Sequence, residues 1–417
     1  MSTAELSPTA AKRLLDIKSR HQWPCVYHFY RNPPVIARGE GVFLFDTAGK
    51  RYLDAYSGVG VMNAGHGNAE ILAAVSEQLA KLQHTTTIYL TEPMLDLAEQ
   101  LASVTPGNLN RSFFCASGSE ANEAAMLLAT LATGRREIVA FDRGLHGRTK
   151  AAMAATGLDM WRTDPWPAET FHRLPAPDHP DCLGAVETRL RQENVAACLI
   201  EPIQGNGGIH VSPAGFLAEL ARLCRRYGTL LIFDEVQTGF GRTGGWFAAE
   251  TFGVVPDVMT VAKALGNGFP IAAAVTHDEI AARYTRPGAS TFGGNPVSSA
   301  AALAALAYHR KHDLARRANT QGRWLKARLT ESLGGHPSVR AIRGCGLMLG
   351  VELTNPGGEP PEVEMGRLLE RLKDEGYLVG RTGVDRNVVT LMPPLIVGQA
   401  ELRGLVDTLA WLIDDIM

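Results

Sequence analysis

The chain has 417 residues, of which 41 are Lys or Arg and 43 are Asp or Glu, for a formal net charge of −2. This near balance argues against the basic footprint of a dedicated nucleic-acid-binding protein. Hydrophobic residues make up 45% and charged residues 20%, which excludes a disordered chain and supplies a large core. At about 100–200 residues per domain, the length predicts two to four domains, or one large α/β unit with an appendage.

Short apolar runs alternate with longer amphipathic segments between about residues 69 and 310. The runs at 195–200, 229–233 and 258–261 have strand length, and the segment 214–227 has apolar residues at helical spacing. This alternation is typical of βαβ units and predicts a mainly parallel sheet with helices on both faces. After about residue 300 the pattern changes to a long helix, short strands and a final helix, which predicts a smaller α+β domain.

The six cysteines show no paired spacing, and several lie in apolar runs, as Cys115 and Cys198 do. We therefore interpret them as small buried thiols. The N-terminal segment lacks the apolar stretch of a signal peptide, and no window approaches 18 apolar residues. These features predict a soluble protein of a reducing compartment, the cytoplasm.

A turn of small residues opens a helix at Ser117. Ser117 followed by Glu120 fits a capping box, and the turn comes after a strand-like segment at 111–115. The same turn presents the backbone N–H groups of Gly118 and Ser119 at a helix N-terminus, where the helix dipole favours an anion. Helix capping and phosphate binding both remain open for this segment.

Two polar residues follow buried strands at one expected edge of the sheet. Asp234 ends the apolar run 229–233, and Lys263 comes directly after 258–261, about one βαβ unit further along. Ligands of open α/β sheets bind at the carboxyl ends of the strands, although a helix cap and a solvated lysine are the alternatives. An acid that holds a pyridinium and an amine that forms a Schiff base are the two groups that pyridoxal phosphate requires.

The GxGxxG pattern at 239–244 lies between these two residues. It follows the acidic pair Asp234-Glu235 and opens no clear helix. A lone match of this kind is weak, and we do not interpret it as a dinucleotide-binding fingerprint.

The chain resembles the class III (ω-type) aminotransferases of the fold-type I pyridoxal-phosphate superfamily. The resemblance runs in family order over nearly the whole chain. Its motifs are 54–66 (DAYSGVGVMNAGH), 117–125 (SGSEANEAA), 145–149 (LHGRT), 201–205 (EPIQG), 233–242 (FDEVQTGFGR), Lys263, 291–296 (TFGGNP) and 343–348 (RGCGLM). Stretches at 83–101, 266–276 and 376–381 are most similar to the alanine–glyoxylate type 2 and phospholyase-like subgroup.

The resemblance implies a fold and its division. A large domain at 61–295 would bind the cofactor in a mainly parallel sheet with helices on both faces. Residues 1–60 and 296–417 would together form a smaller, discontinuous α+β domain. Thr291 would reach the phosphate of the neighbouring subunit, which implies a homodimer with shared active sites.

The resemblance also assigns residue roles. Lys263 would hold pyridoxal 5′-phosphate as an internal aldimine and then, as a base, move a proton from Cα to C4′. Asp234 would keep the pyridine nitrogen protonated. The further implied cofactor contacts are Gly118 and Ser119 at the phosphate, Val236 on a ring face, Gln237 at the ring hydroxyl, Glu201 near Asp234, and Leu145 and His146. No metal is expected, because His66 and His146 are interpreted as structural residues. Arg148 is interpreted as a support for local structure.

The chain departs from the family at three positions. In the family, an aromatic residue usually stacks on the cofactor ring where this chain has Leu145. An aliphatic side chain can still cover the ring but loses the aromatic stacking energy, roughly 0.5–1.5 kcal/mol. Members that use 2-oxoglutarate carry Glu where this chain has Asn206 and Arg where it has Thr390. Losing both members of that ion pair is coherent, since either alone would leave a poorly compensated charge. We therefore expect an enzyme without this dicarboxylate gate.

The substrate pocket is less well defined by the sequence. Arg381 and Arg386 are candidates for a substitute carboxylate anchor, with ordinary surface positions as the alternative. The side chains of Tyr27, Phe29, Ile88 and Tyr89 line the pocket by analogy, or else pack at the dimer interface.

The resemblance predicts an aminotransferase that moves an amino group from an amine or amino acid to an oxo-acid or other carbonyl acceptor. A lyase of the same family, which eliminates ammonia or phosphate, is the nearest alternative because it needs the same Lys263 and Asp234. A non-catalytic cofactor-binding protein is a third alternative, and the intact Lys263, Asp234 and Gln237 argue against it. No nucleic-acid or membrane partner is expected.

Overall fold

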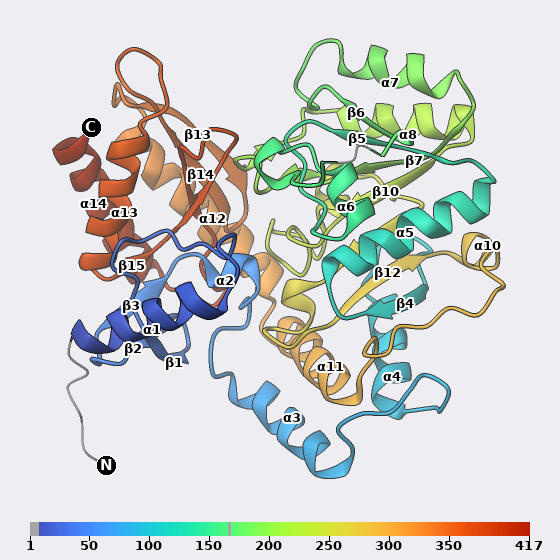
Figure 1. The fold of residues 1–417 in the computed structure, drawn as a ribbon, viewed down its shortest axis with the longest axis horizontal. Coiled ribbons are helices and arrows are strands. Elements are labelled where there is room, and N and C mark those ends of the chain that lie inside the picture. The colour runs from blue at the N-terminus through green and yellow to red at the C-terminus, as the bar shows by residue number, and fades with distance from the viewer. Residues whose placement is uncertain (1–7, 166–167) are drawn as a thin grey trace.

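A seven-stranded sheet forms the centre of the larger part of the molecule (Figure 1). The structure is a computed structural model and describes residues 8–165 and 168–417. The strand order is β4 (Arg111–Cys115), β12 (Ala272–Thr276), β11 (Val258–Val261), β10 (Leu230–Asp234), β7 (Val195–Ile200), β5 (Glu137–Phe141) and β6 (Phe171–Leu174). Only β12 runs antiparallel to its two neighbours. The expected mainly parallel sheet is confirmed.

Helices cover both faces of this sheet. Successive strand residues point to opposite sides, so an apolar strand presents apolar side chains on both faces, and both must be buried. In β10, Leu231 and Phe233 belong to one hydrophobic cluster and Ile232 to another. The first cluster includes residues of α4 (Glu92–Ala102), α7 (Cys182–Leu190), α8 (Phe216–Tyr227) and α11 (Pro296–Lys311). The second includes residues of α5 (Gly118–Thr133), α6 (Lys150–Ala155) and α10 (Asp278–Ala281). The strands are therefore buried on both faces, as continuous apolar runs predict.

The two ends of the chain meet in a second assembly. An antiparallel sheet of β13 (Val339–Cys345), β14 (Met348–Leu353), β17 (Val388–Leu391) and β16 (Gly380–Thr382) shares a core with α12 (Leu314–Leu333), α13 (Glu362–Asp374) and α14 (Gln399–Ile416). β15 (Tyr377–Leu378) pairs in parallel with β3 (Arg51–Asp54), which continues the hairpin β1 (Ile36–Glu40) and β2 (Phe43–Asp46). Figure 1 shows these N- and C-terminal elements side by side.

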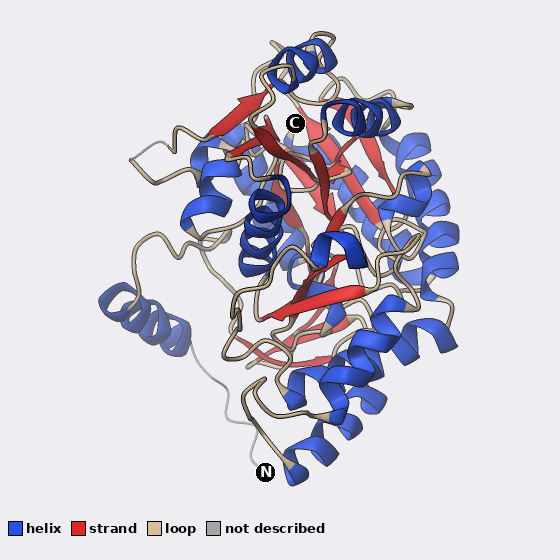
Figure 2. Cartoon of the chain, turned by 90° about the vertical axis from the view of Figure 1, so that its right-hand side faces the viewer, coloured by secondary structure: helices blue, strands red, loops and turns tan. Residues whose placement is uncertain are grey.

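The remaining elements are short or peripheral (Figure 2). They are α1 (Pro8–His21), α2 (Ser57–Gly60), α3 (Ala69–Lys81), η1 (Asp159–Trp161), β8 (Ile203–Gln204), β9 (His210–Val211), α9 (Ala248–Phe252) and η2 (Lys263–Leu265). The domain boundaries at 60/61 and 295/296 stay a prediction. Helix α11 begins beyond the second boundary, yet it packs against α3 and α4 and contributes Ala302 and Leu306 to a sheet face.

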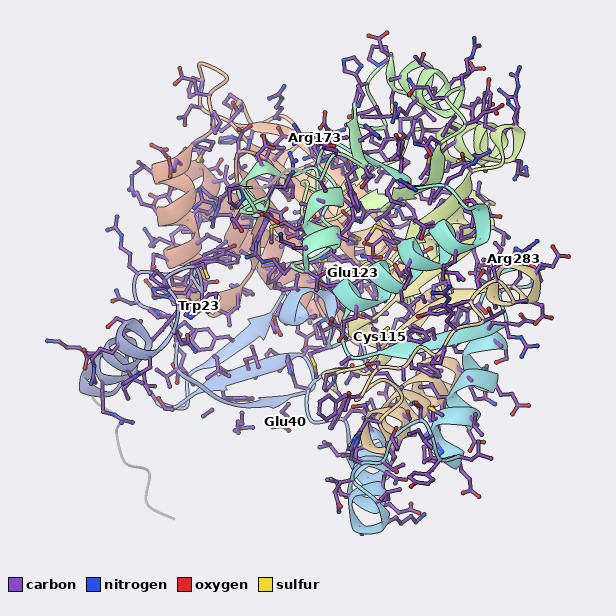
Figure 3. All side chains as sticks on the ribbon, turned by 45° about the vertical axis from the view of Figure 1, so that its right-hand side comes forward. Trp23, Glu40, Cys115, Glu123, Arg173 and Arg283 are labelled. Carbon is purple, nitrogen blue, oxygen red and sulfur yellow. The ribbon has the colours of Figure 1, made fainter. Side chains whose placement is uncertain are left out.

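The predicted elements match the structure within one or two residues at their ends. The helix expected at 214–227 begins at Phe216, because Gly215 has a left-handed φ of 79°, and it ends at Gly228 with φ 61°. Cys115 is buried at the end of β4, whereas Arg283 lies at the outer rim of the molecule (Figure 3). None of the helices in the described ranges combines the length and apolar character needed to cross a bilayer.

Candidate active site

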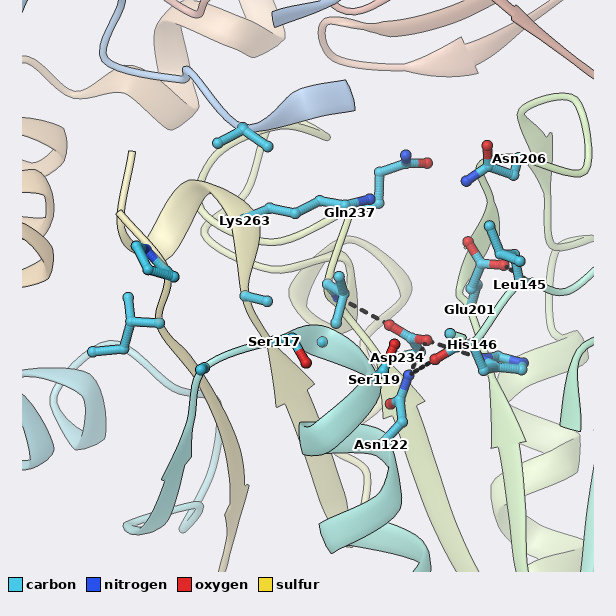
Figure 4. A pocket seen from close by; sticks show the side chains of 18 of the residues that line it. Ser117, Ser119, Asn122, Leu145, His146, Glu201, Asn206, Asp234, Gln237 and Lys263 are labelled. Atoms are coloured by element: carbon cyan, nitrogen blue, oxygen red, sulfur yellow. Dashed lines mark hydrogen bonds and ion pairs between the residues drawn. The ribbon is translucent and has the colours of Figure 1, made fainter. Parts of the chain in front are cut away.

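The carboxyl ends of three parallel strands meet at one cavity of about 360 Å³ (Figure 4). Asp234 is the last residue of β10, Glu201 follows β7, and Lys263 follows β11 after one residue. The first turn of α5 forms another wall with Ser117, Gly118 and Ser119. Parallel strands place these ends at one edge, so the topology brings together residues that lie far apart in the sequence.

A network of donors holds the carboxylate of Asp234 in one orientation. Its Oδ2 accepts a hydrogen bond from Asn122 Nδ2 at 2.8 Å and lies 2.8 Å from His146 Nδ1, while Oδ1 accepts from the Val236 N–H at 3.1 Å. Asn122 is itself fixed, because the Thr260 hydroxyl donates to its Oδ1 at 2.7 Å. Asp234 is 3% exposed. The site therefore contains a buried, fully oriented anion.

Lys263 lines the same cavity in an unusual backbone conformation. Its φ of 48° is left-handed, which is uncommon for a residue with a side chain. Burial lowers the pKa of the Lys263 amine below its ordinary value, and the carboxylates of Glu201 and Asp234 partly oppose that shift. A larger share of this amine is therefore neutral near pH 7 than for a solvated lysine, and a neutral amine can act as nucleophile or base.

Glu201 connects two loops around the cavity. Its carboxylate accepts hydrogen bonds from the backbone N–H groups of Leu145 at 2.8 Å and Gly205 at 3.0 Å. Burial, and then the charge of Asp234, raise the pKa of Glu201 to about 7. Through its hydrogen bond with the Leu145 N–H, Glu201 holds the Leu145 segment against the cavity.

The start of α5 is built for an anion. Ser117 accepts a hydrogen bond from the Glu120 N–H at 3.3 Å, as the capping box predicts. The N–H groups of Gly118 and Ser119 make no hydrogen bond within the described chain. A Cβ on Gly118 would lie 2.9 Å from Val236 Cγ1, so only glycine fits there. Capping and anion binding are compatible, because they use different N–H groups.

Gln237 supplies an independent indication of a ligand-binding position. Its Oε1 is buried and has no hydrogen-bond partner within the described chain, although the side chain lines the cavity. Buried acceptors are almost always paired, so a donor is expected at this position. The ring hydroxyl of pyridoxal phosphate would provide one. The residues present therefore fit that cofactor at the phosphate end and at the ring.

A second cavity of about 580 Å³ continues from the first, since Leu145, Asn206 and Lys263 line both. Its walls carry aromatic side chains and two arginines. The residues that line this second cavity include Tyr27, Phe29, Tyr56, Met160, Trp161, Arg381, Thr382 and Arg386. The reacting groups thus lie next to a larger space that can hold the body of a substrate.

Comparisons with known proteins identify the family. The family model for aminotransferase class III matches residues 28–413. The chain belongs to the class III aminotransferases. Enzymes of this family are pyridoxal-phosphate-dependent transaminases, and we assign that class of activity to the chain.

Individual relatives agree with this assignment. An alanine–glyoxylate aminotransferase 2 homolog from Arabidopsis thaliana is 38% identical over 400 residues, covering 93% of this chain and 84% of the relative. An acetylornithine aminotransferase from Mycobacterium tuberculosis is 40% identical over 402 residues, covering 95% and 96%. A solved aminotransferase from Bacillus anthracis superposes with a TM-score of 0.91 at 32% identity, covering 98% and 99%.

In this class III aminotransferase, most of the expected site residues line one of the two cavities. The first is lined by Gly118, Ser119, Leu145, His146, Glu201, Asn206, Asp234, Val236, Gln237 and Lys263, and the second by Tyr27, Asn206 and Arg381, among others. Three others lie elsewhere. Thr291 and Tyr89 are exposed and line neither cavity, and Thr390 is fully buried with its Oγ1 2.6 Å from Thr382 Oγ1.

Three contributors had not been singled out from the aminotransferase sequence. Asn122 fixes Asp234, and Tyr56 and Trp161 form walls of the second cavity. A signal existed only for Asn122, which is a polar residue on the buried side of a strongly apolar helix. Tyr56 lies between β3 and α2, and Trp161 ends the short helix η1, so no spacing pattern places them at the cavity.

Proposed function

We propose that this protein is a pyridoxal-phosphate-dependent aminotransferase that transfers an amino group from an amine or amino acid to an oxo-acid or other carbonyl acceptor. The cofactor would be attached covalently at Lys263 Nζ. The observation that carries the proposal is the position of the Lys263 amine in one cavity with the oriented carboxylate of Asp234. The reducing cytoplasm is the compartment we propose, from the six cysteines without paired spacing.

Each side chain has a defined task in this proposal. When bound, pyridoxal phosphate supplies an electron sink for the substrate's α-carbon. Lys263 Nζ, with its lowered pKa, accepts the proton from that carbon and later returns it. Asp234 Oδ atoms, held by Asn122 and His146, hold a proton on the ring nitrogen by charge.

Five further residues would hold the cofactor. The free N–H groups of Gly118 and Ser119 would bind the phosphate, and Gln237 would pair with the ring hydroxyl. Leu145 and Val236 would provide apolar contact with the ring, since both line the cavity. This arrangement would orient the ring without aromatic stacking.

We further propose a homodimer in which Thr291 of one chain reaches the phosphate bound by its partner. Thr291 is exposed, and the neighbouring Phe292 is 60% exposed. Phe292 lies 5.2 Å from the ring of His84, which precedes Ile88 and Tyr89, two side chains exposed by 82% and 64%. Exposed large apolar side chains of this kind are typical of an interface.

The usual dicarboxylate gate is absent in this proposal. Asn206 is neutral and lines both cavities, and the Thr390 hydroxyl is paired with Thr382 rather than turned toward a cavity. We therefore expect slower turnover with glutamate and 2-oxoglutarate than with alanine and pyruvate. Equal saturation kinetics for the two pairs would contradict this part of the proposal.

A donor panel followed by absorbance tests the proposed reaction. Purified holoenzyme is mixed with single amines, without an acceptor, and the cofactor spectrum is recorded. A transaminase converts the aldehyde form of the cofactor stoichiometrically to the amine form, and a carbonyl acceptor then restores it. Release of ammonia with the aldehyde form retained would identify a lyase instead and overturn the proposal.

A further inference from the structure

We propose that Arg381 and Arg386 form a subsite for an anionic group of the substrate, so that the enzyme takes amines carrying a carboxylate or a phosphate beyond an apolar segment. This inference rests on the proposed function, because it names the substrate class of the same site. It assigns specificity to two residues for which the sequence left a carboxylate anchor and an ordinary surface position open.

The backbone of one hairpin sets the positions of both arginines. Arg381 lies on β16, and Arg386 lies in the turn that connects β16 to β17. The Arg381 Nε–H donates to the backbone oxygen of Arg386 at 2.6 Å, and the Arg386 N–H donates to Gly383 oxygen at 3.1 Å. Arg386 has a left-handed φ of 54°. The turn therefore holds the two side chains on the same wall of the second cavity.

The protein compensates their charges only in part. Within residues 8–165 and 168–417, neither arginine forms an ion pair, and no Asp or Glu lines this cavity. Three other arginines with little exposed side chain are paired, namely Arg143 with Asp178, Arg189 with Glu137 and Arg343 with Glu352. Burial and then the charge of Arg386 lower the pKa of Arg381, and the charge of Glu362 opposes that shift only in part. Two neighbouring guanidinium groups without an ion-pair partner are a repulsive arrangement that a bound anion would relieve.

The fully buried Arg242 differs from Arg381 in the hydrogen bonds that its guanidinium group makes. It has no carboxylate partner either, but it donates to the backbone oxygens of Leu347 and Pro393 and to the side-chain oxygen of Asn63. Arg381 makes a single hydrogen bond, through Nε, and its terminal nitrogens make none within the described chain. The terminal nitrogens of Arg381 are therefore available for a bidentate contact with a carboxylate or phosphate.

Aromatic rings define what accompanies the anionic group. The Arg386 guanidinium lies 5.0 Å from the centre of the Tyr27 ring, which in turn lies 6.1 Å from Trp161. Phe29 is 6.0 Å from the same guanidinium and 6.2 Å from Tyr56. These contacts restrict the guanidinium and cover the wall with apolar surface. A ligand that reaches both Lys263 and the arginines must lie against these rings, so an apolar or aromatic segment is favoured.

Matched amines test the subsite in the holoenzyme. We compare 4-(aminomethyl)benzoate with 4-methylbenzylamine, and phosphoethanolamine with propylamine, by single-turnover absorbance. The variants are Arg381→Met, Arg386→Met, the double variant and Arg386→Lys. Arg403→Met is the control, because Arg403 also lies over an aromatic ring, that of Trp324 at 5.8 Å, but on an exposed face of α14 that lines neither cavity.

We expect the double variant to lose about 10- to 100-fold in kcat/KM for at least one of the two anionic amines, mainly through KM. For 4-methylbenzylamine and propylamine, which lack the anionic group, kcat/KM should stay within about twofold of the wild-type value. Arg386→Lys should recover part of the loss, and the control should match wild type. Loss on the carboxylate alone or the phosphate alone identifies the anion. Equal losses for the amines with and without the anionic group, or no loss for either, would overturn the subsite.

A second measurement does not depend on turnover. Calorimetry measures binding of 4-methylbenzoate and phenyl phosphate, which carry no amine, to wild type and the double variant. The subsite predicts that wild type binds at least one of them and that the double variant binds it at least tenfold more weakly. Binding of neither, or equal binding by both proteins, overturns the subsite. A wild-type spectrum unchanged by every amine would instead overturn the proposed function.

Discussion

Asp234 and Lys263 illustrate how single residues acquire reactivity from their surroundings. Asp234 is an ordinary carboxylate whose orientation is set by Asn122 and His146. Lys263 is an ordinary amine whose proton affinity is lowered by burial. Neither effect is a property of the residue type. Both follow from the packing of helix α5 and the loop before α6 on the strand ends.

Replacing Asp234 with Asn tests the electrostatic role of this carboxylate. Asn keeps the size of the side chain but removes the charge that the reaction needs near the ring nitrogen. We expect kcat to fall about 10²- to 10³-fold, the range for removal of one preorganised electrostatic contact. Cofactor absorbance should persist, because Lys263 is intact. Wild-type kcat in this variant would show that Asp234 has no catalytic role.

At the scale of secondary-structure elements, the junction of β4 and α5 forms the proposed phosphate site. The Gly118 Cα lies so close to Val236 that a side chain cannot be added without displacement. Helix α5 is 16 residues long, so its first N–H groups carry the full favourable helix dipole.

A Gly118→Ala variant tests this close approach. The added methyl would meet Val236 Cγ1 at 2.9 Å and push the first turn of α5 away from its position. We expect cofactor affinity to fall about 10- to 100-fold, since such overpacking costs about 1–3 kcal/mol. Equilibrium titration of the apoenzyme gives the affinity. Gly184→Ala, on α7 with no atom within 4 Å of the new methyl, is the matched control and should bind normally.

The loop between β10 and α9 contains a second buried carboxyl, Glu235. It accepts hydrogen bonds from the N–H groups of Ala248 at 3.0 Å and Ala249 at 2.7 Å, and from the Thr238 hydroxyl. Burial nevertheless raises the pKa of Glu235 to about 7 in the folded state. The unfolded chain loses this proton near pH 4.5, so the folded state binds more protons between these values. Stability from this group therefore falls as pH rises toward 7.

Comparison of wild type with Glu235→Gln isolates this linkage. The free energy of unfolding of wild type should decline relative to that of the variant between about pH 5 and 7, by at most about 1.4 kcal/mol per pH unit. Above about pH 8 the difference should become constant. Urea unfolding at several pH values measures it. A difference that does not change with pH would contradict the raised pKa.

For the molecule as a whole, local patterns predict the mainly parallel α/β fold that the structure has. Apolar runs mark the buried strands, and Asp234 and Lys263 stand at strand ends, as expected. The roles of the site residues rest on the family resemblance and stay predictions. The reversed direction of β12 was not predictable, since Ala272–Thr276 has the same apolar pattern as its parallel neighbours. The positions of Tyr56 and Trp161 in the cavity could not be predicted, because they depend on how the connection between β3 and α2 and the short helix η1 fold back on the sheet edge. Arg381 and Arg386 could be suspected only as alternatives to surface positions.

The proposed dimer can be tested at the same scale. Replacing both Ile88 and Phe292 with Asp places charges at two exposed apolar positions. We expect a monomer by light scattering, with weaker cofactor binding because Thr291 of the partner is lost. Val363→Asp is the control, since Val363 is similarly exposed, at 67%, but lies on α13. A double variant that stays dimeric would place the interface elsewhere.

The absorbance of a Lys263→Ala variant tests the central claim most directly. Wild type and variant are reconstituted with pyridoxal phosphate, and spectra are recorded before and after addition of an amine that wild type consumes. The account predicts that wild type shows the band of a covalently attached cofactor and converts it to the amine form. The variant should lack that band and any catalytic turnover. A variant that retained the band, or turned over at the wild-type rate, would contradict the account.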